Sequence, residues 1–370
     1  MTKYTPVLLS EECFGIGDYP CDDVYSAREQ MAIVPASTKG VSYFLVSRDN
    51  GATFEKVERK NPRHEKFREM SDGTFLAFSF NSVFGNYYYD FDTKEDIPFC
   101  FAVYRANSME DILNDKISTD FVRIDIPGLT FGFGDSGNRH TGGASGWREL
   151  SNGDIYMTMY GQFRDDTTLC PYFQQWGKYD FYLYRTWAVV SHDKGKTWEY
   201  VGTIADCQTY PIADVNAEGY CEADIEETSP GHLVCVLRTQ GHEVFSPMYV
   251  CHSDDFGKTW TKPEIFCDWG VLPKLLKMKD GTLVCCSGHW HTMLIFSDDD
   301  GKTWSEPFIV EPCDGLWDKS ATGYNSFYES RPGELTVIYA DPKEGIAAGA
   351  GDFQKRQIYR KTFRIDKENK

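Results

Sequence analysis

Short hydrophobic runs recur along this 370-residue chain in pairs, and a turn separates the two runs of each pair. The apolar positions alternate with polar ones or fill the run, a pattern typical of strands in a buried sheet. Glycine, usually after Asp, Asn or Pro, marks the turn because it adopts left-handed backbone conformations at little cost. Six hairpins follow this pattern, at 35–46, 68–78, 148–160, 227–237, 277–286 and 329–339. They predict an all-β chain built from six similar units.

A second repeat, Ser-x-Asp-x-Gly-x-Thr followed by Trp or Phe, lies between the hairpins. Its aspartate can accept hydrogen bonds from backbone N–H groups inside a tight turn, and its glycine can take a positive φ. Four copies occur, at 47–54, 191–198, 253–260 and 297–304. We interpret these segments, called repeat turns below, as structural and not catalytic.

The two repeats together predict a six-bladed β-propeller that occupies residues 1–370 as a single domain. Such a fold can exceed the usual one-core limit of about 250–300 residues because each blade packs only on its neighbours. Residues 4–12 are expected to add an outer strand to the last blade and so remove an exposed sheet edge. A short helical stretch at 108–115 takes the place of the second blade's repeat turn. The expected blades span 24–57, 60–125, 135–203, 216–266, 268–312 and 320–366.

The charge of the chain limits its partners. Asp and Glu number 56 against 38 Lys and Arg, which gives a net charge of -18 at pH 7. Because phosphate binding needs a basic surface, a nucleic-acid partner is not expected. Aromatic residues make up 15% of the chain, and such residues suit both strands and sugar-binding clefts.

The sequence shows no targeting or membrane signal. No window approaches the ~18 apolar residues that a membrane span needs, and residues 1–20 lack a basic stretch followed by an apolar run. We therefore expect a cytoplasmic protein with reduced thiols and no membrane contact. The twelve cysteines show no CxxC or Cys/His spacing, so we expect neither a metal site nor a cofactor. The oligomeric state is left open.

Repeat turns of this kind, set among six hairpins, resemble the Asp boxes of sialidases (neuraminidases) and of related bacterial neuraminidase repeat (BNR) proteins. The resemblance covers nearly the whole chain and implies a six-bladed β-propeller of the sialidase type. In a hairpin, the start of the first strand and the end of the second lie at the same edge. In a propeller, these positions surround one mouth of the central axis, so residues about eight or nine positions from each turn are candidates for a functional site.

Several of these candidates match sialidase site residues in spacing. Glu222 begins and Arg238 ends the fourth-blade hairpin CEADIEETSPGHLVCVLR, and Tyr324 precedes the last hairpin in GYNSFYESRPG. Arg63 stands nine residues before Asp72 in PRHEKFREMSDG, where sialidases carry an arginine. The resemblance implies that Tyr324 is a nucleophile, that Glu222 is its base, and that Arg63 and Arg238 belong to a clamp for a carboxylate.

These residue types suit one another chemically. A tyrosine has a free pKa of about 10, so it needs a neighbouring carboxylate to accept its proton. Arginine binds a carboxylate through two parallel hydrogen bonds. A neutral nucleophile suits a sugar that carries its own carboxylate, and glycosidases with a tyrosine nucleophile form a recognised exception to the two-carboxylate mechanism.

The chain departs from the sialidase pattern at two places. His289 stands where relatives have a third arginine, at the end of the fifth-blade hairpin. The acid/base aspartate has no recognisable context, although Asp90 and Asp92 lie in the expected loop. Residues near the predicted mouth are further candidates for substrate binding. They are His140 on a glycine-rich loop, Asn81, His289 and His291.

The leading interpretation is a glycoside hydrolase that releases a terminal acidic sugar, sialic acid or a related anionic residue, from an oligosaccharide substrate. A first alternative is a lyase or hydrolase of uronate-containing glycans, in which a His or Tyr base and a cation beside the carboxylate would promote β-elimination. A second alternative is a propeller that binds glycans without catalysis. In a purely structural interpretation, Glu222 and Arg238 form a buried ion pair and Tyr324 packs in the core.

Overall fold

The computed structural model describes most of the chain. Its residues are 2–17, 20–21, 23–38, 41–59, 66–79, 99–124, 126–130, 146–163, 165–171, 182–212, 217–240, 246–288, 291–312, 324–341 and 356–368. In these ranges nearly all regular structure is β-strand, as the hydrophobic pattern predicts. The chain groups into two compact units. The first comprises Met1–Ala77, Tyr104–Ser118 and Leu276–Lys370, and the second comprises Phe78–Val103 and Thr119–Leu275.

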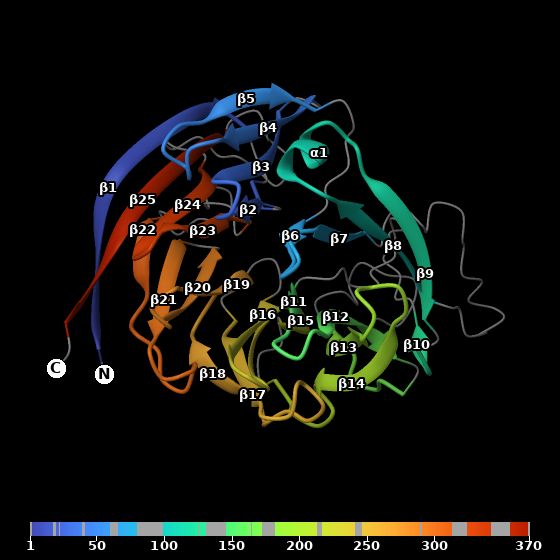
Figure 1. Cartoon of the computed structure of the whole chain (residues 1–370). Coiled ribbons are helices and arrows are strands. Elements are labelled where there is room, and N and C mark those ends of the chain that lie inside the picture. The colour runs from blue at the N-terminus through green and yellow to red at the C-terminus, as the bar shows by residue number, and fades with distance from the viewer. Residues whose placement is uncertain are drawn as a thin grey trace. The chain divides into compact units, whose positions relative to one another are not determined.

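The strands form six sheets, the blades of a six-bladed β-propeller (Figure 1). The first blade contains β2 (Val24–Ser26), β3 (Met31–Thr38), β4 (Val41–Ser47) and β5 (Glu55–Glu58). The second contains β6 (Arg68–Glu69), β7 (Phe75–Ser79), β8 (Phe99–Ala106) and β9 (Ser118–Ile124). The third contains β10 (Leu129–Thr130), β11 (Gly146–Glu149), β12 (Ile155–Phe163), β13 (Arg185–Ser191) and β14 (Glu199–Ala205).

The remaining three blades each have four strands. The fourth contains β15 (Ala217–Ser229), β16 (His232–Gln240), β17 (Met248–Ser253) and β18 (Glu264–Cys267). The fifth contains β19 (Val271–Lys277), β20 (Leu283–Gly288), β21 (Thr292–Ser297) and β22 (Phe308–Glu311). The sixth contains β23 (Ser326–Arg331), β24 (Glu334–Asp341), β25 (Gln357–Glu368) and the amino-terminal strand β1 (Lys3–Ile16).

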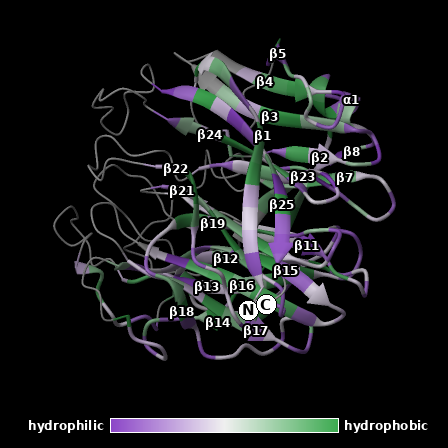
Figure 2. Cartoon of the chain, turned by 90° about the vertical axis from the view of Figure 1, so that its left-hand side faces the viewer, coloured by the Kyte–Doolittle hydropathy of each residue, from purple (hydrophilic) through white to green (hydrophobic). Residues whose placement is uncertain are grey.

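The sixth blade joins the two ends of the chain. Strand β1 pairs with β25 in antiparallel register, from Lys3 opposite Glu368 to Ile16 opposite Gln357. The two strands run side by side in Figure 1, and Figure 2 shows hydrophobic and hydrophilic positions mixed along both. The prediction that residues 4–12 add an outer strand to the last blade is confirmed. Because β1 covers β25, the ladder of β25 is not left as an open edge.

Each repeat turn joins the last two strands of its blade. In the turn after β13, Ser191 Oγ donates to Asp193 Oδ1 at 2.9 Å and accepts a bond from Gly195 N at 2.8 Å. Thr197 N donates to Asp193 Oδ1 at 2.8 Å, and Gly195 has a φ of 80°. The same contacts recur in the other three turns. Hydrogen bonds among its own residues therefore stabilise each of these turns.

One of the six predicted hairpins occupies a different position within its blade from the other five. The segment 35–46, predicted as one of the six hairpins, connects β3 to β4, the second and third strands of its blade. The turn 27–30 joins β2 to β3 instead. This turn lacks glycine, and Gln30 takes the positive φ of 56°. Since Gln30 O accepts a bond from Asn50 N at 2.9 Å, the neighbouring repeat turn supports a conformation that the sequence pattern does not signal.

The helical stretch expected in the second blade is confirmed. Helix α1 (Met109–Leu113) lies between β8 and β9, where four of the other blades carry a repeat turn. Ser108 caps it by accepting a hydrogen bond from Asp111 N at 3.1 Å, as serine commonly does at a helix start. Among the helices of the described part of the chain, none has the length and apolar character needed to span a bilayer.

Glutamates at the end of the first strand hold the turn of the preceding blade. Glu227 on β15 accepts bonds from the Ser151 backbone at 2.6 Å and hydroxyl at 2.8 Å. Glu329 on β23 accepts a bond from Lys279 N at 2.8 Å. Both also accept a bond from a glycine N–H in their own turn. One carboxylate thus fixes two adjacent turns, and charge-assisted bonds of this kind are stronger than neutral ones.

Candidate functional site

The fourth blade brings Glu222 and Arg238 together. Glu222 lies on β15 and Arg238 on β16, and the register places Cys221 opposite Arg238. Arg238 Nη1 lies 2.6 Å from Glu222 Oε2, and the two side chains are 8% and 12% exposed. The two residues therefore form a nearly buried ion pair with a charge-assisted hydrogen bond.

The backbone at Glu222 has an uncommon conformation. Its φ of 41° lies in the left-handed region, as does that of Leu272 on β19, and residues other than glycine seldom adopt such values. The β15–β16 register shifts on both sides of Cys221, and an irregularity of this kind can redirect a side chain. Leu272 N also donates to Glu222 Oε2 at 3.2 Å. Strained backbone of this sort is found where its surroundings hold it and often lies at functional sites.

A second acid, Glu218, lies beside the same arginine. Glu218 Oε1 is 3.6 Å from Arg238 Nη2, and its side chain is 8% exposed. Burial and the charge of Glu222 raise the pKa of Glu218 to about 7, although the charge of Arg238 acts in the opposite direction. Sequence reasoning missed Glu218. The available signal was an acidic residue within the largely buried run AEGYCEADI, only four positions before Glu222.

Tyr324 and His291 both belong to the first unit. Tyr324 lies directly before β23 and is half-buried. His291 lies between β20 and β21, also half-buried, and burial lowers its pKa. A neutral imidazole can both donate and accept a hydrogen bond. Glu222 and Arg238 belong to the second unit, so a shared site with Tyr324 and His291 stays a prediction.

The remaining candidates lie outside the described residues. They are Arg63, Asn81, His140 and His289, together with the aspartates Asp90 and Asp92. Their roles stay predictions. Among the described residues, no group of three or more His, Cys, Asp or Glu side chains is arranged to hold a metal ion.

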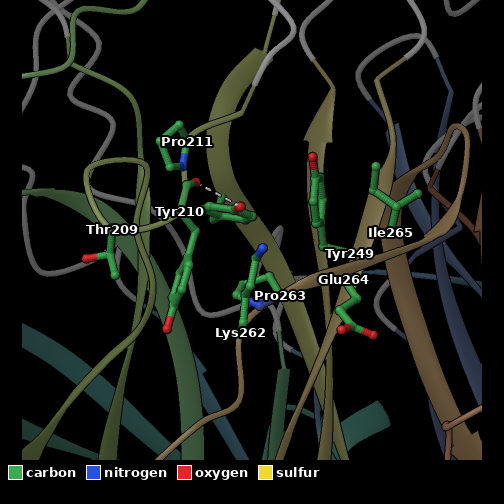
Figure 3. A pocket seen from close by; sticks show the side chains of 9 residues that line it. Thr209, Tyr210, Pro211, Tyr249, Lys262, Pro263, Glu264 and Ile265 are labelled. Atoms are coloured by element: carbon green, nitrogen blue, oxygen red, sulfur yellow. Dashed lines mark hydrogen bonds between the residues drawn. The ribbon is translucent and has the colours of Figure 1, made fainter.

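A cavity of about 580 Å³ lies on the second unit (Figure 3). Three tyrosines line it, and none of the predicted site residues does. Tyr220 OH donates to Tyr210 O at 3.1 Å, and the Tyr220 ring packs edge to face against Tyr249 with 5.4 Å between the ring centroids. Lys262 and Glu264 lie nearby. The volume is within the range of small-ligand sites, about 300–1,000 Å³. The other lining residues are Thr209, Pro211, Pro263 and Ile265.

The second unit therefore presents two different kinds of chemistry. Glu218, Glu222 and Arg238 form a cluster of two carboxyl groups and one guanidinium. The guanidinium can bind an anionic group, and a carboxylate can accept a proton. The cavity presents aromatic rings with one cationic and one anionic side chain at its border, a composition that suits an uncharged or weakly charged polar ligand.

Comparison with known proteins supports the fold. No family model and no curated protein sequence matches the chain. A solved protein of unknown function from Dyadobacter fermentans is 17% identical, with a TM-score of 0.64 over 98% of both chains. Trypanosoma rangeli sialidase in complex with the inhibitor DANA is 14% identical, with a TM-score of 0.51 over 98% of this chain and 60% of the sialidase.

A mutant of the same sialidase that displays trans-sialidase activity is 13% identical, with a TM-score of 0.50 over 97% of this chain and 60% of the mutant. The chain thus spans about three fifths of the length of these sialidases. At such low identity the likeness concerns the fold and not the activity. The chain has the six-bladed, sialidase-like propeller fold.

Proposed function

We propose that this chain is a glycosidase of the sialidase type, which releases a terminal acidic sugar from an oligosaccharide. The observation that supports this most directly is the Glu222–Arg238 pair, 2.6 Å apart on adjacent strands. The resemblance assigns a proton-accepting glutamate and a carboxylate-binding arginine to these two positions. The sialidase-like fold supports the same assignment.

In this proposal, Tyr324 Oη attacks the anomeric carbon while Glu222 takes the phenolic proton. The glycosidic C–O bond breaks, and an acid, for which Asp90 and Asp92 are candidates, gives a proton to the leaving oxygen. Water then attacks the anomeric carbon and the bond from this carbon to Tyr324 Oη breaks. A proton of the water passes to that aspartate, and the tyrosine regains the proton held by Glu222. The balance is one water consumed and one glycosidic bond hydrolysed.

Arg238, Arg63 and His289 hold the anionic group of the sugar in this scheme, and His140, His291 and Asn81 contact its other polar groups. A guanidinium fixes a carboxylate through two hydrogen bonds, which orients the anomeric carbon as well as binding it. A single His in place of a third arginine gives a weaker clamp when neutral. A uronate is therefore a substrate candidate alongside sialic acid.

A product screen by mass spectrometry tests the proposal. The protein is incubated with sialyllactose and with uronate-containing oligosaccharides, alongside the variants Tyr324→Phe and Glu222→Gln. Hydrolysis gives products that together are heavier than the substrate by one water, whereas a lyase gives an unsaturated product without added water. We expect each variant to lower turnover by about 10²–10⁴-fold. Unchanged turnover in either variant would refute the mechanism.

A second candidate function, glycan binding without catalysis, is favoured by the tyrosine-lined cavity (Figure 3). Tyrosine rings offer flat faces for sugar rings, and Lys262 and Glu264 can bond to hydroxyl groups. This function predicts saturable binding to oligosaccharides and no product in the screen.

A further inference from the structure

Glu218 is a buried acid, and one oxygen of its carboxyl group lacks a hydrogen bond to any described residue. Its side chain is 8% exposed. Within the described ranges, Oε1 accepts no hydrogen bond, and the nearest cationic atom, Arg238 Nη2, lies 3.6 Å away. A buried carboxylate oxygen without a hydrogen bond is costly. Protonation removes the charge and with it most of this cost.

Glu218 lies in a cluster with more negatively than positively charged side chains. Glu222 follows it on β15, and Arg238 faces both acids from β16. Tyr184, in the segment before β13, donates its backbone N–H to Glu218 O at 2.8 Å, and the charge of Glu218 raises the pKa of the Tyr184 and Cys221 side chains. Both of these are neutral at pH 7, since burial also raises their pKa values. Two ionised glutamates would therefore leave this cluster with a net negative charge.

We propose that Glu218 is a positioning residue that holds a proton when an anionic group binds at Arg238, so that anion binding is coupled to proton uptake. This inference rests on the proposed function, in which Arg238 binds the sugar carboxylate. With Glu218 neutral, Glu222 alone balances Arg238. With Glu218 ionised, the cluster repels the incoming anion.

The direction of the pH dependence follows from linkage. The pKa of Glu218 is about 7 without ligand, and an anion nearby favours the protonated form further. Binding is therefore strongest below pH 7 and weakens as the pH rises above it. For uptake of a single proton the dissociation constant rises by up to about tenfold per pH unit. A glutamine at 218 keeps the shape of the side chain, is neutral at every pH, and should abolish this dependence.

Calorimetric titrations with N-acetylneuraminic acid and with glucuronic acid test the coupling, in steps from about pH 6 to about pH 8. We expect the wild type to lose affinity over this range by up to about tenfold, and Glu218→Gln to keep its low-pH affinity. Glu226→Gln is the matched control, because Glu226 lies on the same strand but pairs with Arg148 at 2.8 Å. It should retain the wild-type pH dependence. Equal pH dependence in wild type and Glu218→Gln would overturn the proposal.

Infrared titration of the unliganded protein separates this inference from the proposed function. A buried, protonated carboxylic acid has its own carbonyl absorption, so the wild-type-minus-Glu218→Gln difference spectrum should contain a band that disappears as the pH rises through about 7. Absence of this band would overturn the inference, even if an acidic sugar is hydrolysed. If neither sugar binds, the proposed function fails and the infrared band alone decides whether Glu218 holds the proton. Glu218→Met, similar in size and uncharged, replaces the glutamine variant if that variant does not fold.

Discussion

Arg148 lies buried against Asp224, with its Nη1 3.2 Å from Oδ1 and its Nη2 3.3 Å from Oδ2. The two side chains are 9% and 1% exposed. Arg148 Nη2 also donates to Leu275 O at 2.8 Å, and Leu275 N donates to Asp224 Oδ2 at 2.8 Å. This bidentate pair therefore connects β11, β15 and the Leu275 end of the second unit on β19.

Removal of the arginine should destabilise the protein strongly. Arg148→Met leaves Asp224 and Glu226 without their cation, and breaking one side of a buried pair typically costs about 3–5 kcal/mol. Urea denaturation followed by circular dichroism measures the loss. Arg364→Met is the control, because its bonds to Asp366 are similarly bidentate, at 2.7 and 3.0 Å, but solvent-exposed. Its cost should stay below about 1 kcal/mol, and equal losses in the two variants would contradict the prediction.

Gly146 gives a second test of the same packing. A Cβ placed there would lie 2.1 Å from Asp224 Oδ1 and 2.7 Å from the Asp224 Cα. Since the backbone atom cannot move aside cheaply, Gly146→Ala should lower the free energy of unfolding by about 1–3 kcal/mol or more. Gly153→Ala is a useful comparison, because Gly153 has a φ of 86° but nothing within 4 Å of its Cβ position. It tests conformational strain alone, expected at about 1 kcal/mol, and a larger cost at Gly153 than at Gly146 would refute the steric argument.

The repeat turns could be predicted because their causes are local. Serine, aspartate, glycine and threonine form each repeat turn within eight residues, so the pattern carries the structure. The turn at 27–30 could not be predicted in this way. Gln30 has no intrinsic preference for its positive φ, and it relies on Asn50 in a turn that comes 20 residues later.

The candidate site was predictable only in part, for a similar reason. The spacing of Glu222 and Arg238 around one hairpin turn brings them to the same sheet edge, and this follows from hairpin geometry. Burial of Glu218 depends on the irregular register of β15 and on the side of the strand that packs against the segment around Tyr184. Neither the register nor the packed side of the strand can be deduced from the residue types of this segment alone. The Arg148–Asp224 pair joins residues 76 positions apart, beyond the reach of any local pattern.

The tyrosine-lined cavity predicts how a glycan-binding function would respond to mutation. Tyr249→Ala removes a ring from the cavity wall (Figure 3), and an aromatic contact is worth about 0.5–1.5 kcal/mol. Affinity for an oligosaccharide bound there should fall by roughly 2–10-fold in a calorimetric titration. Tyr249→Phe keeps the ring and should bind nearly as well as the wild type. Unaltered affinity in Tyr249→Ala would mean that any glycan binding takes place elsewhere.

The repeat turns should also respond to acid in a defined direction. Hydrogen bonds from the Thr197 hydroxyl, and then from its backbone N–H, lower the pKa of Asp193 to about 2. Because this folded-state pKa lies below the unfolded value of about 4, the bonds contribute to stability above about pH 4, and the contribution is lost as the pH falls through about 2. Thr197→Val removes the strongest of these bonds, so the pKa of Asp193 should rise towards its usual value.

Carboxyl chemical shifts followed by NMR from about pH 2 to about pH 6 measure this change directly. Thr197→Ser is the matched control, since it keeps a hydroxyl group that can donate to Asp193 Oδ2, as Thr197 does at 2.7 Å. The valine variant should also be less stable than the serine variant at neutral pH, and this difference should shrink as the pH falls from about 4 to about 2. Titration of Asp193 at the same pH in both variants would show that the Thr197 hydroxyl does not set the pKa. The backbone bond from Thr197, at 2.8 Å, would then be sufficient by itself.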